Sequence, residues 1–261
     1  MEKIAPLTSR SLLRLSGADT IGFLQYLITC DVDHLQPGQA TFGALLTPQG
    51  KILFDFFVLR DADTIMLDVN VAQCDELMKR LTFYKLRANV VIERDKRQVY
   101  ARWGGSSAEG FADPRVAALG RRFYADALEC NAMEADWHAH RIEIGVPQSG
   151  LDFDVASLFP HDASMDQFET GGVDFTKGCY VGQEVVSRMH HRSTARNRFV
   201  HVTTQASPLA NAGSPLTAAG RTVGTMGSSA GSHGLALVRV DRVGKALETG
   251  EPITLDAQTV H

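Results

Sequence analysis

The pattern of apolar residues changes close to residue 196, and this change limits the possible folds more than any other feature. Before that point, helical spacing alternates with longer strand-like runs. After it the chain is rich in Val, Thr, Gly, Ser and Pro, and its apolar runs are short. Short runs separated by Gly and Pro are typical of a small β-barrel or sandwich. We therefore expect residues 1–195 to form one region and residues 196–261 to form a separate barrel.

The first region is predicted to mix helices with antiparallel strands. Helical spacing occurs in residues 20–28, 71–81, 133–143 and 182–189, and strand-like runs occur in 40–47, 51–60, 64–70, 90–92 and 99–103. Asp19 stands where an N-cap would start the first helix. Ile65, Leu67 and Val69 share one face, as in a half-buried strand. Because these elements lack the regular rhythm of a doubly wound sheet, the pattern favours an α+β fold.

The composition is that of an ordinary globular protein. Of the 261 residues, 44% are hydrophobic and 21% are charged, and the longest apolar stretch, residues 52–59, is interrupted by Asp55. That stretch is too short to span a bilayer. The first residues, MEKIAP, lack the basic start, apolar core and cleavage site of a signal peptide. We expect a cytoplasmic protein without membrane contacts.

The charge is distributed unevenly along the chain. The net charge of −4 argues against broad attraction to nucleic acid. Residues 185–240 nevertheless contain six Arg and no Asp or Glu, which leaves 20 basic and 30 acidic residues elsewhere. This segment could bind an anionic group such as a carboxylate or phosphate, or it could be a solvated face that balances an acidic body. The pattern alone favours neither interpretation.

The four cysteines are far apart in the sequence. Cys30, Cys74, Cys130 and Cys179 show neither a Cys-x-x-Cys pair nor the paired Cys/His spacing of zinc or cluster sites. We therefore predict reduced thiols and no metal held by this chain. Cys30 and Cys74 fall in apolar, predicted helical stretches, where a free cysteine is usually core filler. Cys179 alone has unusual neighbours.

Residues 177–184, which read KGCYVGQE, gather the side chains most suited to chemistry. The two glycines allow positive φ or the close approach of a ligand, and such a segment suits the border of a cleft. A thiol just ahead of a helix, with Lys177 and Arg188 nearby, would favour the thiolate, whereas Glu184 opposes it. The alternative is a cysteine buried in a tight turn.

Residues 177–192, KGCYVGQEVVSRMHHR, closely resemble the signature of the YgfZ family and of its mitochondrial iron–sulfur assembly relatives. The resemblance covers almost the whole chain. Its other segments are LSGADTIGFLQ at 15–25, TPQGKILFD at 47–55, RIEIGVP at 141–147, VGTMGS at 223–228 and ALVR at 236–239. It implies an aminomethyltransferase-like (GcvT-like) fold, in which two interleaved ferredoxin-like modules and a C-terminal β-barrel surround a central hole.

The resemblance also implies a function and a set of site residues. Members bind tetrahydrofolate in the central hole and help to assemble or maintain 4Fe–4S enzymes, including radical-type tRNA-methylthiolating enzymes. An aromatic face suits a pterin and a carboxylate suits its N–H groups, while Arg10 stands where relatives have a tryptophan. The implied catalytic residues are Cys179, Lys177, Gln183, Glu184 and Arg188, and the implied folate-binding residues are Trp137, Asp162, Arg10 and Asp55.

Two other functions stay open at this point. Aminomethyltransferases carry an Asp-Asp pair where this chain has Phe54 and Asp55, and their counterpart of residues 177–179 lacks the cysteine. Both differences weaken the case for a folate-dependent one-carbon transferase, although Asp55 could still take the role of that Asp-Asp pair. The third function is a folate-independent thiol enzyme or cluster carrier. Folate binding without dependence on Cys179 would indicate the transferase. Dependence on Cys179 without folate binding would indicate the thiol enzyme or cluster carrier.

Overall fold

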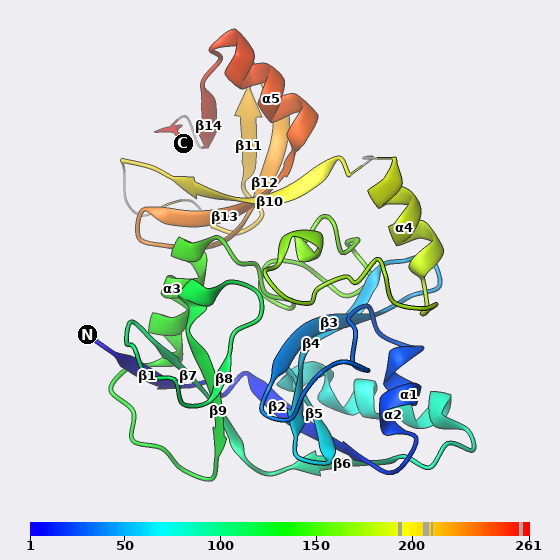
Figure 1. The fold of residues 1–261 in the computed structure, drawn as a ribbon. Helices are drawn as coiled ribbons and strands as arrows, with labels where there is room; N and C mark the ends of the chain where they lie inside the picture. The colour runs from blue at the N-terminus through cyan, green and yellow to red at the C-terminus, as the bar shows by residue number, and fades with distance from the viewer. Residues whose placement is uncertain (193–194, 206–208, 210, 256–257) are drawn as a thin grey trace.

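The computed structural model describes residues 1–192, 195–205, 209, 211–255 and 258–261, which form three sheets (Figure 1). Their strand orders are β3-β4-β5-β2-β6, β1-β7-β9-β8 and β10-β13-β12-β11-β14-β15. Neighbouring strands in each sheet run antiparallel. We call the three parts, in this order, the first module, the second module and the barrel.

The first module is a five-stranded sheet with helices on one face. It contains β2 (Arg10–Ser16), α1 (Thr20–Gln25), β3 (Ala40–Leu46), β4 (Ile52–Asp61), β5 (Thr64–Asn70), α2 (Cys74–Lys85) and β6 (Val91–Asp95). α1 and α2 pack on one face, and the other face meets the second module. Phe56 and Phe57, neighbours on β4, are therefore both buried. The expectation of a half-buried β5 is wrong for the same reason, because Met66 and Asp68 are buried as fully as Leu67.

The start of α1 differs from the prediction. Asp19 precedes the helix, but its side chain makes no capping bond. Its Oδ2 atom instead accepts a hydrogen bond from the backbone N–H of Asn89 at 2.7 Å. Cys30 lies beyond the end of α1 rather than within it, although it is buried as expected. Asp19, which the sequence suggested as a cap, therefore ties the loop before α1 to the loop between α2 and β6.

The second module is interleaved with the first along the chain. It contains β1 (Lys3–Pro6), β7 (Gln98–Trp103), β8 (Phe111–Ala112), β9 (Arg121–Ala125) and α3 (Glu134–Ile144). β1 pairs with β7, so the chain begins in the second module, builds the first, and then returns. α3 ends at Gly145, which has φ 90° as a left-handed C-cap requires. Figure 1 shows α3 between this sheet and the barrel.

The barrel follows a long connection that contains α4 (Gln183–His191). Its elements are β10 (Asn197–Thr203), β11 (Pro215–Ala218), β12 (Arg221–Ala230), β13 (His233–Arg239), α5 (Val240–Thr249), β14 (Ile253–Leu255) and β15 (Gln258–Thr259). Thr203 and His261 exchange backbone hydrogen bonds of 2.7 and 2.9 Å, which join the end of the chain to β10. α5 was not predicted. In the described part of the chain, no helix combines the length and apolarity needed to cross a membrane.

Candidate functional site

Charged side chains are buried where the first two modules face each other. β2, β4 and β5 carry Arg10, Asp55 and Asp68 toward the second module, on the face that also holds Phe57. The second module contributes residues from β9, from the loop after β8 and from α3. We call this group the charged centre, and its members are Arg10, Asp55, Asp68, Asp113, Arg115, Arg122, Tyr124 and Trp137.

The side chain of Asp68 has two partners in the charged centre, Arg10 and Tyr124. Its Oδ1 atom lies 2.6 Å from Nε of Arg10, and both side chains are buried. The hydroxyl of Tyr124 donates to Oδ2 of Asp68 at 3.1 Å. Burial and the Asp68 carboxylate raise the pKa of Tyr124, so its hydroxyl stays protonated. Burial lowers the pKa of Arg10, but Asp68 and Asp55 outweigh that effect and raise it, so the guanidinium of Arg10 stays charged.

Aromatic rings flank the other two arginines of the centre. The guanidinium of Arg115 lies 4.8 Å from the ring centroid of Phe57 and donates to both oxygens of Asp113, at 3.0 and 2.8 Å. The guanidinium of Arg122 lies 4.6 Å from the Phe57 centroid and 4.9 Å from a Trp137 ring. Stacking on an aromatic face favours a guanidinium group. Arg115 therefore has a carboxylate partner, whereas Arg122 is held mainly by rings.

Two side chains of the charged centre have buried polar atoms without a partner among the described residues. They are Asp55, at Oδ1, and Arg122, at Nε and Nη1. Burial raises the pKa of Asp55, and Arg10 and Arg115 oppose that shift. Burial also lowers the pKa of Arg122. An unpaired buried polar group costs about 1–3 kcal/mol. The centre therefore has a free acceptor on Asp55 and free donors on Arg122.

Asp162 lies outside the charged centre. Its Oδ2 atom accepts a hydrogen bond from the backbone N–H of Phe159 at 3.0 Å, and its carbonyl accepts one from Phe199 of β10 at 3.1 Å. The side chain therefore closes its own loop, and the backbone ties that loop to the barrel. Burial raises the pKa of Asp162, and the Phe159 amide opposes this shift. The structure thus brings the other three candidate folate-binding residues together and holds Asp162 apart.

Cys179 lies in a turn that packs against the first module. We call residues 174–182 the thiol segment. At its start, Oδ1 of Asp174 accepts a hydrogen bond from the backbone N–H of Lys177 at 2.9 Å. At its end, Gly182 has φ 80° and approaches the β3–β4 turn so closely that a Cβ atom would lie 2.5 Å from the carbonyl oxygen of Thr47. Cys179, between these anchors, is an exposed free thiol.

Lys177 fixes the thiol segment to the first module. Its Nζ atom donates to the carbonyls of Ile28 and Cys30 at 2.9 and 2.6 Å. Burial lowers the pKa of Lys177, and the nearby Cys30 and Asp31 oppose the shift. The ammonium group therefore binds the chain that follows α1. This position gives Lys177 an anchoring role, and its expected electrostatic effect on Cys179 stays a prediction.

The remaining candidate residues lie on the first turns of α4. The backbone N–H of Gln183, the first residue of α4, donates to the carbonyl of Tyr180 at 3.2 Å. Glu184 and Arg188 are one helical turn apart, with 3.9 Å between Oε1 and Nη2, and their side chains are 92% and 49% exposed. Solvent screens such charges, so their effect on Cys179 is weak.

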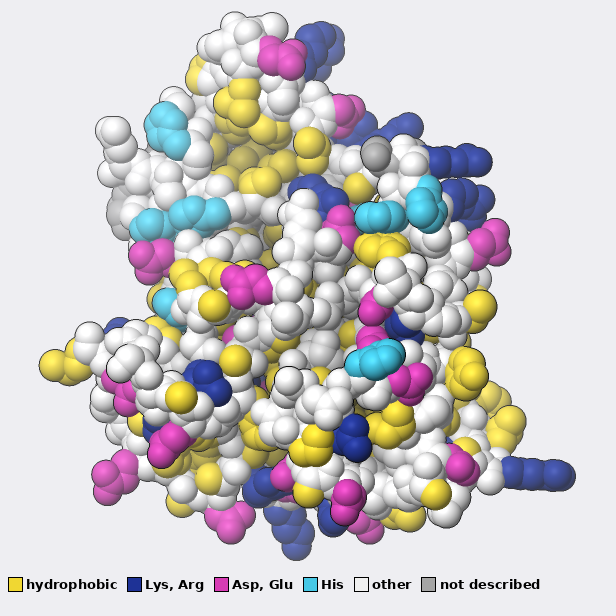
Figure 2. Space-filling model, viewed as in Figure 1, with side chains coloured by type: hydrophobic (Ala, Val, Ile, Leu, Met, Phe, Trp, Pro, Cys, Tyr) yellow, Lys and Arg dark blue, Asp and Glu magenta, His cyan; other side chains and the backbone are white. Residues whose placement is uncertain are grey.

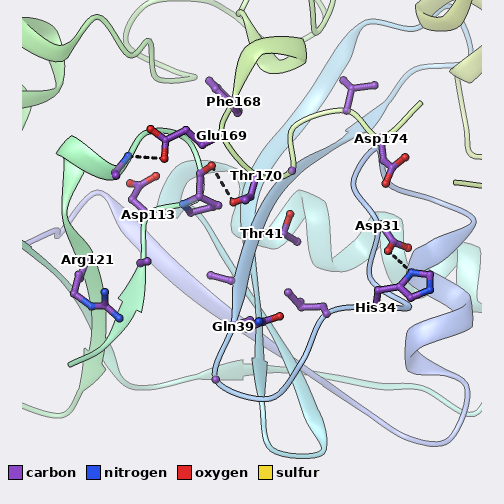
Figure 3. A pocket seen from close by; sticks show the side chains of 18 of the residues that line it. Asp31, His34, Gln39, Thr41, Asp113, Arg121, Phe168, Glu169, Thr170 and Asp174 are labelled. Atoms are coloured by element: carbon purple, nitrogen blue, oxygen red, sulfur yellow. Dashed lines mark hydrogen bonds and ion pairs between the residues drawn. The ribbon is translucent and has the colours of Figure 1, made fainter. Parts of the chain in front are cut away.

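A cavity of about 1000 Å³ opens between the first two modules, next to the thiol segment (Figure 3). Its walls come from the start of β3, the loops on either side of β8, and residues 166–176. The carboxylates that line it are Asp31, Asp113, Asp166, Glu169 and Asp174. No candidate residue is part of its described lining, but Asp113 belongs both to the cavity and to the charged centre. The cavity has the volume of a small-molecule site, and Asp113 is the lining residue that it shares with that centre.

The sequence did not single out most residues of the charged centre. Asp68 had one detectable signal, a charged residue within an otherwise apolar strand. Arg122 and Tyr124 lie in a stretch with few clear patterns, and Arg115 has no motif around it. The family resemblance pointed to Arg10, Asp55 and Trp137, which lie far apart in the sequence and meet in the structure.

Known proteins are similar to this chain in two respects, its overall fold and its barrel. Residues 196–261 match the CAF17 C-terminal β-barrel domain. A solved structure with a similar fold is the glycine cleavage system aminomethyltransferase T from Bartonella henselae, with a TM-score of 0.73 and 18% sequence identity. The match covers 92% of this chain and 79% of that chain. The predicted α+β, aminomethyltransferase-like fold with a small C-terminal barrel is thereby confirmed.

Similar curated sequences are named as mitochondrial iron–sulfur cluster assembly factors, the IBA57 homologues. That of Mycosarcoma maydis is 32% identical over 229 residues, which cover 76% of this chain and 56% of the relative. That of Chaetomium globosum is 29% identical over 240 residues, which cover 75% and 54%. The chain thus spans about half the length of these relatives. The predicted resemblance to iron–sulfur assembly factors is confirmed at this level.

Proposed function

We propose that this chain binds a reduced folate in the charged centre and supports the assembly or maintenance of 4Fe–4S proteins in the cytoplasm. Its clients would include tRNA-methylthiolating enzymes, and Cys179 would act on the client. The similarity to iron–sulfur cluster assembly factors supports the role. The observation that carries the choice of ligand is a pair of buried side chains with unpartnered polar atoms, Asp55 at Oδ1 and Arg122 at Nε and Nη1, the latter against the ring of Trp137.

These side chains fit the functional groups of a pterin. A pterin presents N–H donors next to a carbonyl acceptor, and carboxylate and guanidinium groups complement this pattern. Asp55 would accept from the N–H groups, Arg122 would donate to the acceptor, and Trp137 would cover one face of the ring. A bound reduced folate would supply a one-carbon group or reducing equivalents. The cavity beside Asp113 gives the ligand a route to the centre.

Intrinsic fluorescence tests the ligand directly. The chain has two tryptophans, and the rings of Trp103 and Trp137 lie 5.6 Å apart, so both report on the charged centre. We expect tetrahydrofolate to change this fluorescence, and Asp55→Asn to weaken binding about tenfold or more. Asp162→Asn is the matched control and should bind normally. Unchanged fluorescence in the wild type would contradict folate binding, and loss only in the Asp162 variant would move the ligand to that loop.

Arg122 offers a second test, in which stability and binding change in opposite directions. Replacing a buried charge that lacks an ion partner by an apolar group of similar volume removes its desolvation penalty, which is about 1–3 kcal/mol for an unsatisfied buried polar group. We expect Arg122→Met to raise the free energy of unfolding and to weaken tetrahydrofolate binding. Arg115→Met, which removes the partner of Asp113, should lower the free energy of unfolding. If Arg122→Met destabilises the protein and leaves folate binding intact, Arg122 is structural.

The cellular role can be tested by complementation. A bacterium that lacks its own YgfZ-type protein would receive the wild-type chain, Cys179→Ala, or the control Cys130→Ala, and tRNA methylthiolation would be measured. We expect the wild type and the control to restore the modification and Cys179→Ala to fail. Restoration by Cys179→Ala but not by Asp55→Asn would favour a folate-dependent transferase. The opposite pattern would favour a folate-independent thiol protein.

A further inference from the structure

An exposed, arginine-rich face lies where α4 meets the barrel. We call it the basic face, and its members are Arg188, Arg192, Arg196, Arg221 and Arg242. Figure 2 shows Lys and Arg side chains gathered over α4 and the adjoining end of the barrel. Residues 185–240, which supply four of the five, contain no Asp or Glu. The face is therefore a local excess of positive charge on a chain whose net charge is −4.

Hydrogen bonds join three of the elements that carry these arginines. Arg192 caps α4, and its N–H donates to the carbonyl of Arg188 at 3.1 Å. The carbonyl of Arg196, just before β10, accepts from Val240 at the start of α5 at 2.9 Å. Nη1 of Arg242 donates at 2.6 Å to the carbonyl of the residue that follows Arg221 on β12. β10, β12 and α5 therefore meet at this face, and α4 lies beside the start of β10 (Figure 1).

The positive charge of the basic face is largely unneutralised. Within the described ranges, Arg192, Arg196, Arg221 and Arg242 form no ion pair with a carboxylate within 4.0 Å. The partner of Arg188 is Glu184, which is 92% exposed and 3.9 Å away. Neighbouring like charges repel one another, and an anionic surface laid against them would remove this cost.

The character of the face favours a protein over a nucleic acid. All of its cations are arginines, whose planar guanidinium groups bind carboxylates through two hydrogen bonds. Domains that bind nucleic acid are usually basic as a whole, whereas this chain has a pI of about 6.1. A polyanion that extended beyond the face would meet the rest of the chain, with its 30 acidic and 21 other basic residues. A compact acidic patch would avoid that repulsion.

We propose that the basic face docks a partner protein through a surface cluster of Asp and Glu side chains. α4 connects this face to Cys179, since the thiol segment precedes the helix and Arg192 ends it. The nine residues of α4 span about 13 Å, which is less than the width of a typical protein interface. A partner on the basic face would thus reach the exposed thiol. The proposal goes beyond the proposed function, because electrostatic docking requires neither folate nor an iron–sulfur cluster.

Binding of model polyanions tests this proposal without a client enzyme. The probes are a short fluorescein-labelled poly-L-glutamate peptide and a single-stranded oligodeoxynucleotide of the same charge, measured by fluorescence anisotropy with the full chain. The variants are Arg192→Glu with Arg196→Glu, and Arg221→Glu with Arg242→Glu. The control is Lys79→Glu with Arg87→Glu, which makes the same charge change at exposed positions on and after α2. Thermal unfolding of each variant checks that it is folded.

We expect the wild type and the control to bind poly-L-glutamate, with affinity falling as salt rises. Each basic-face variant should bind it about tenfold or more weakly. Equal loss in the control would show that net charge alone is responsible, and this would overturn the proposal. Tighter binding of the oligonucleotide than of the peptide would also overturn it, in favour of a nucleic-acid partner. None of these outcomes affects the tests of folate binding or of complementation.

Discussion

The charged centre and the thiol segment place ionisable groups in opposite surroundings. In the centre, Arg10 and Asp68 are removed from water and must satisfy each other, so the identity of every neighbour matters. In the thiol segment Cys179 stays in solvent, as do Glu184 and Arg188 on the adjoining α4, whereas Lys177 is drawn into the protein. The comparison shows how one chain can combine a rigid, selective interior with a group that other molecules can reach.

The largest expected effect is on thiol reactivity. Cys30 is buried and burial raises its pKa to about 12, and Cys74 is also buried, whereas Cys179 and Cys130 are exposed. We expect iodoacetamide to modify the buried pair on the order of a thousandfold more slowly, because they react only after the structure opens. Peptide mass spectrometry of the native protein gives the four rates. A rate at Cys179 as low as that at Cys30 would show that the thiol segment is closed.

The next effect concerns stability within the charged centre. Arg10→Met would leave the buried Asp68 carboxylate without its ion partner, and such a loss costs about 3–5 kcal/mol. Arg94→Met is the control, since Arg94 and Asp75 also lie 2.6 Å apart but their side chains are 43% and 66% exposed. We expect urea denaturation to show little change for this control. Equal losses for the two variants would mean that burial does not distinguish these pairs.

A smaller effect separates two roles for Lys177. Lys177→Met removes two hydrogen bonds to backbone carbonyls, and we expect the free energy of unfolding to fall by about 1–3 kcal/mol. The rate of Cys179 alkylation at neutral pH should change little. Lys79→Met, on an exposed face of α2, is the control for loss of a lysine. If Lys177→Met instead slows alkylation and leaves stability unchanged, Lys177 activates the thiol, as the sequence alone suggested.

The smallest effect involves a buried histidine beside the thiol segment, where the rings of His161 and Phe175 lie 6.0 Å apart. His161 is buried with both ring nitrogens unpartnered among the described residues. Burial lowers its pKa below the ordinary value for histidine, with Asp166 opposing this shift and Arg198 and His190 adding to it. The unfolded chain therefore takes up a proton more readily, and stability falls as the pH drops below 6.5. His161→Phe should flatten this part of the stability profile; a profile identical to the wild type would contradict the assignment.

Local patterns predicted individual elements well but not their burial. Residues 64–70 were expected as a strand and form β5 with the same bounds, and the helix expected at 133–143 is shifted by one residue. Whether a strand is buried on one face or two depends on a partner that comes from elsewhere in the chain. Asp68 was therefore assigned to an exposed face. α5 had a detectable signal, the helical spacing of Val240, Val243 and Leu247, and was overlooked.

The site was only partly visible in the sequence. The positive φ expected from a glycine near Cys179 occurs at Gly182, whereas Gly178 has open space where a Cβ atom would lie. The charged centre required knowledge of which strand faces meet. A buried arginine such as Arg122 is hard to recognise, since nothing in its neighbourhood distinguishes it from a solvent-exposed arginine. The assignment of Asp162 and Asp55 to folate stays a prediction.

The pairing of β1 with β7 has a consequence for how the protein is made. A ribosome releases Lys3–Pro6 early, but their partner Gln98–Trp103 emerges only after the whole of the first module. At roughly 5–20 residues per second, the first strand waits on the order of seconds. During this interval the first module can fold while the strand is still single. β1 can pair with β7 only after this interval. Until then β1 is an unpaired strand, and a chaperone that binds unpaired strands would act at this stage of synthesis.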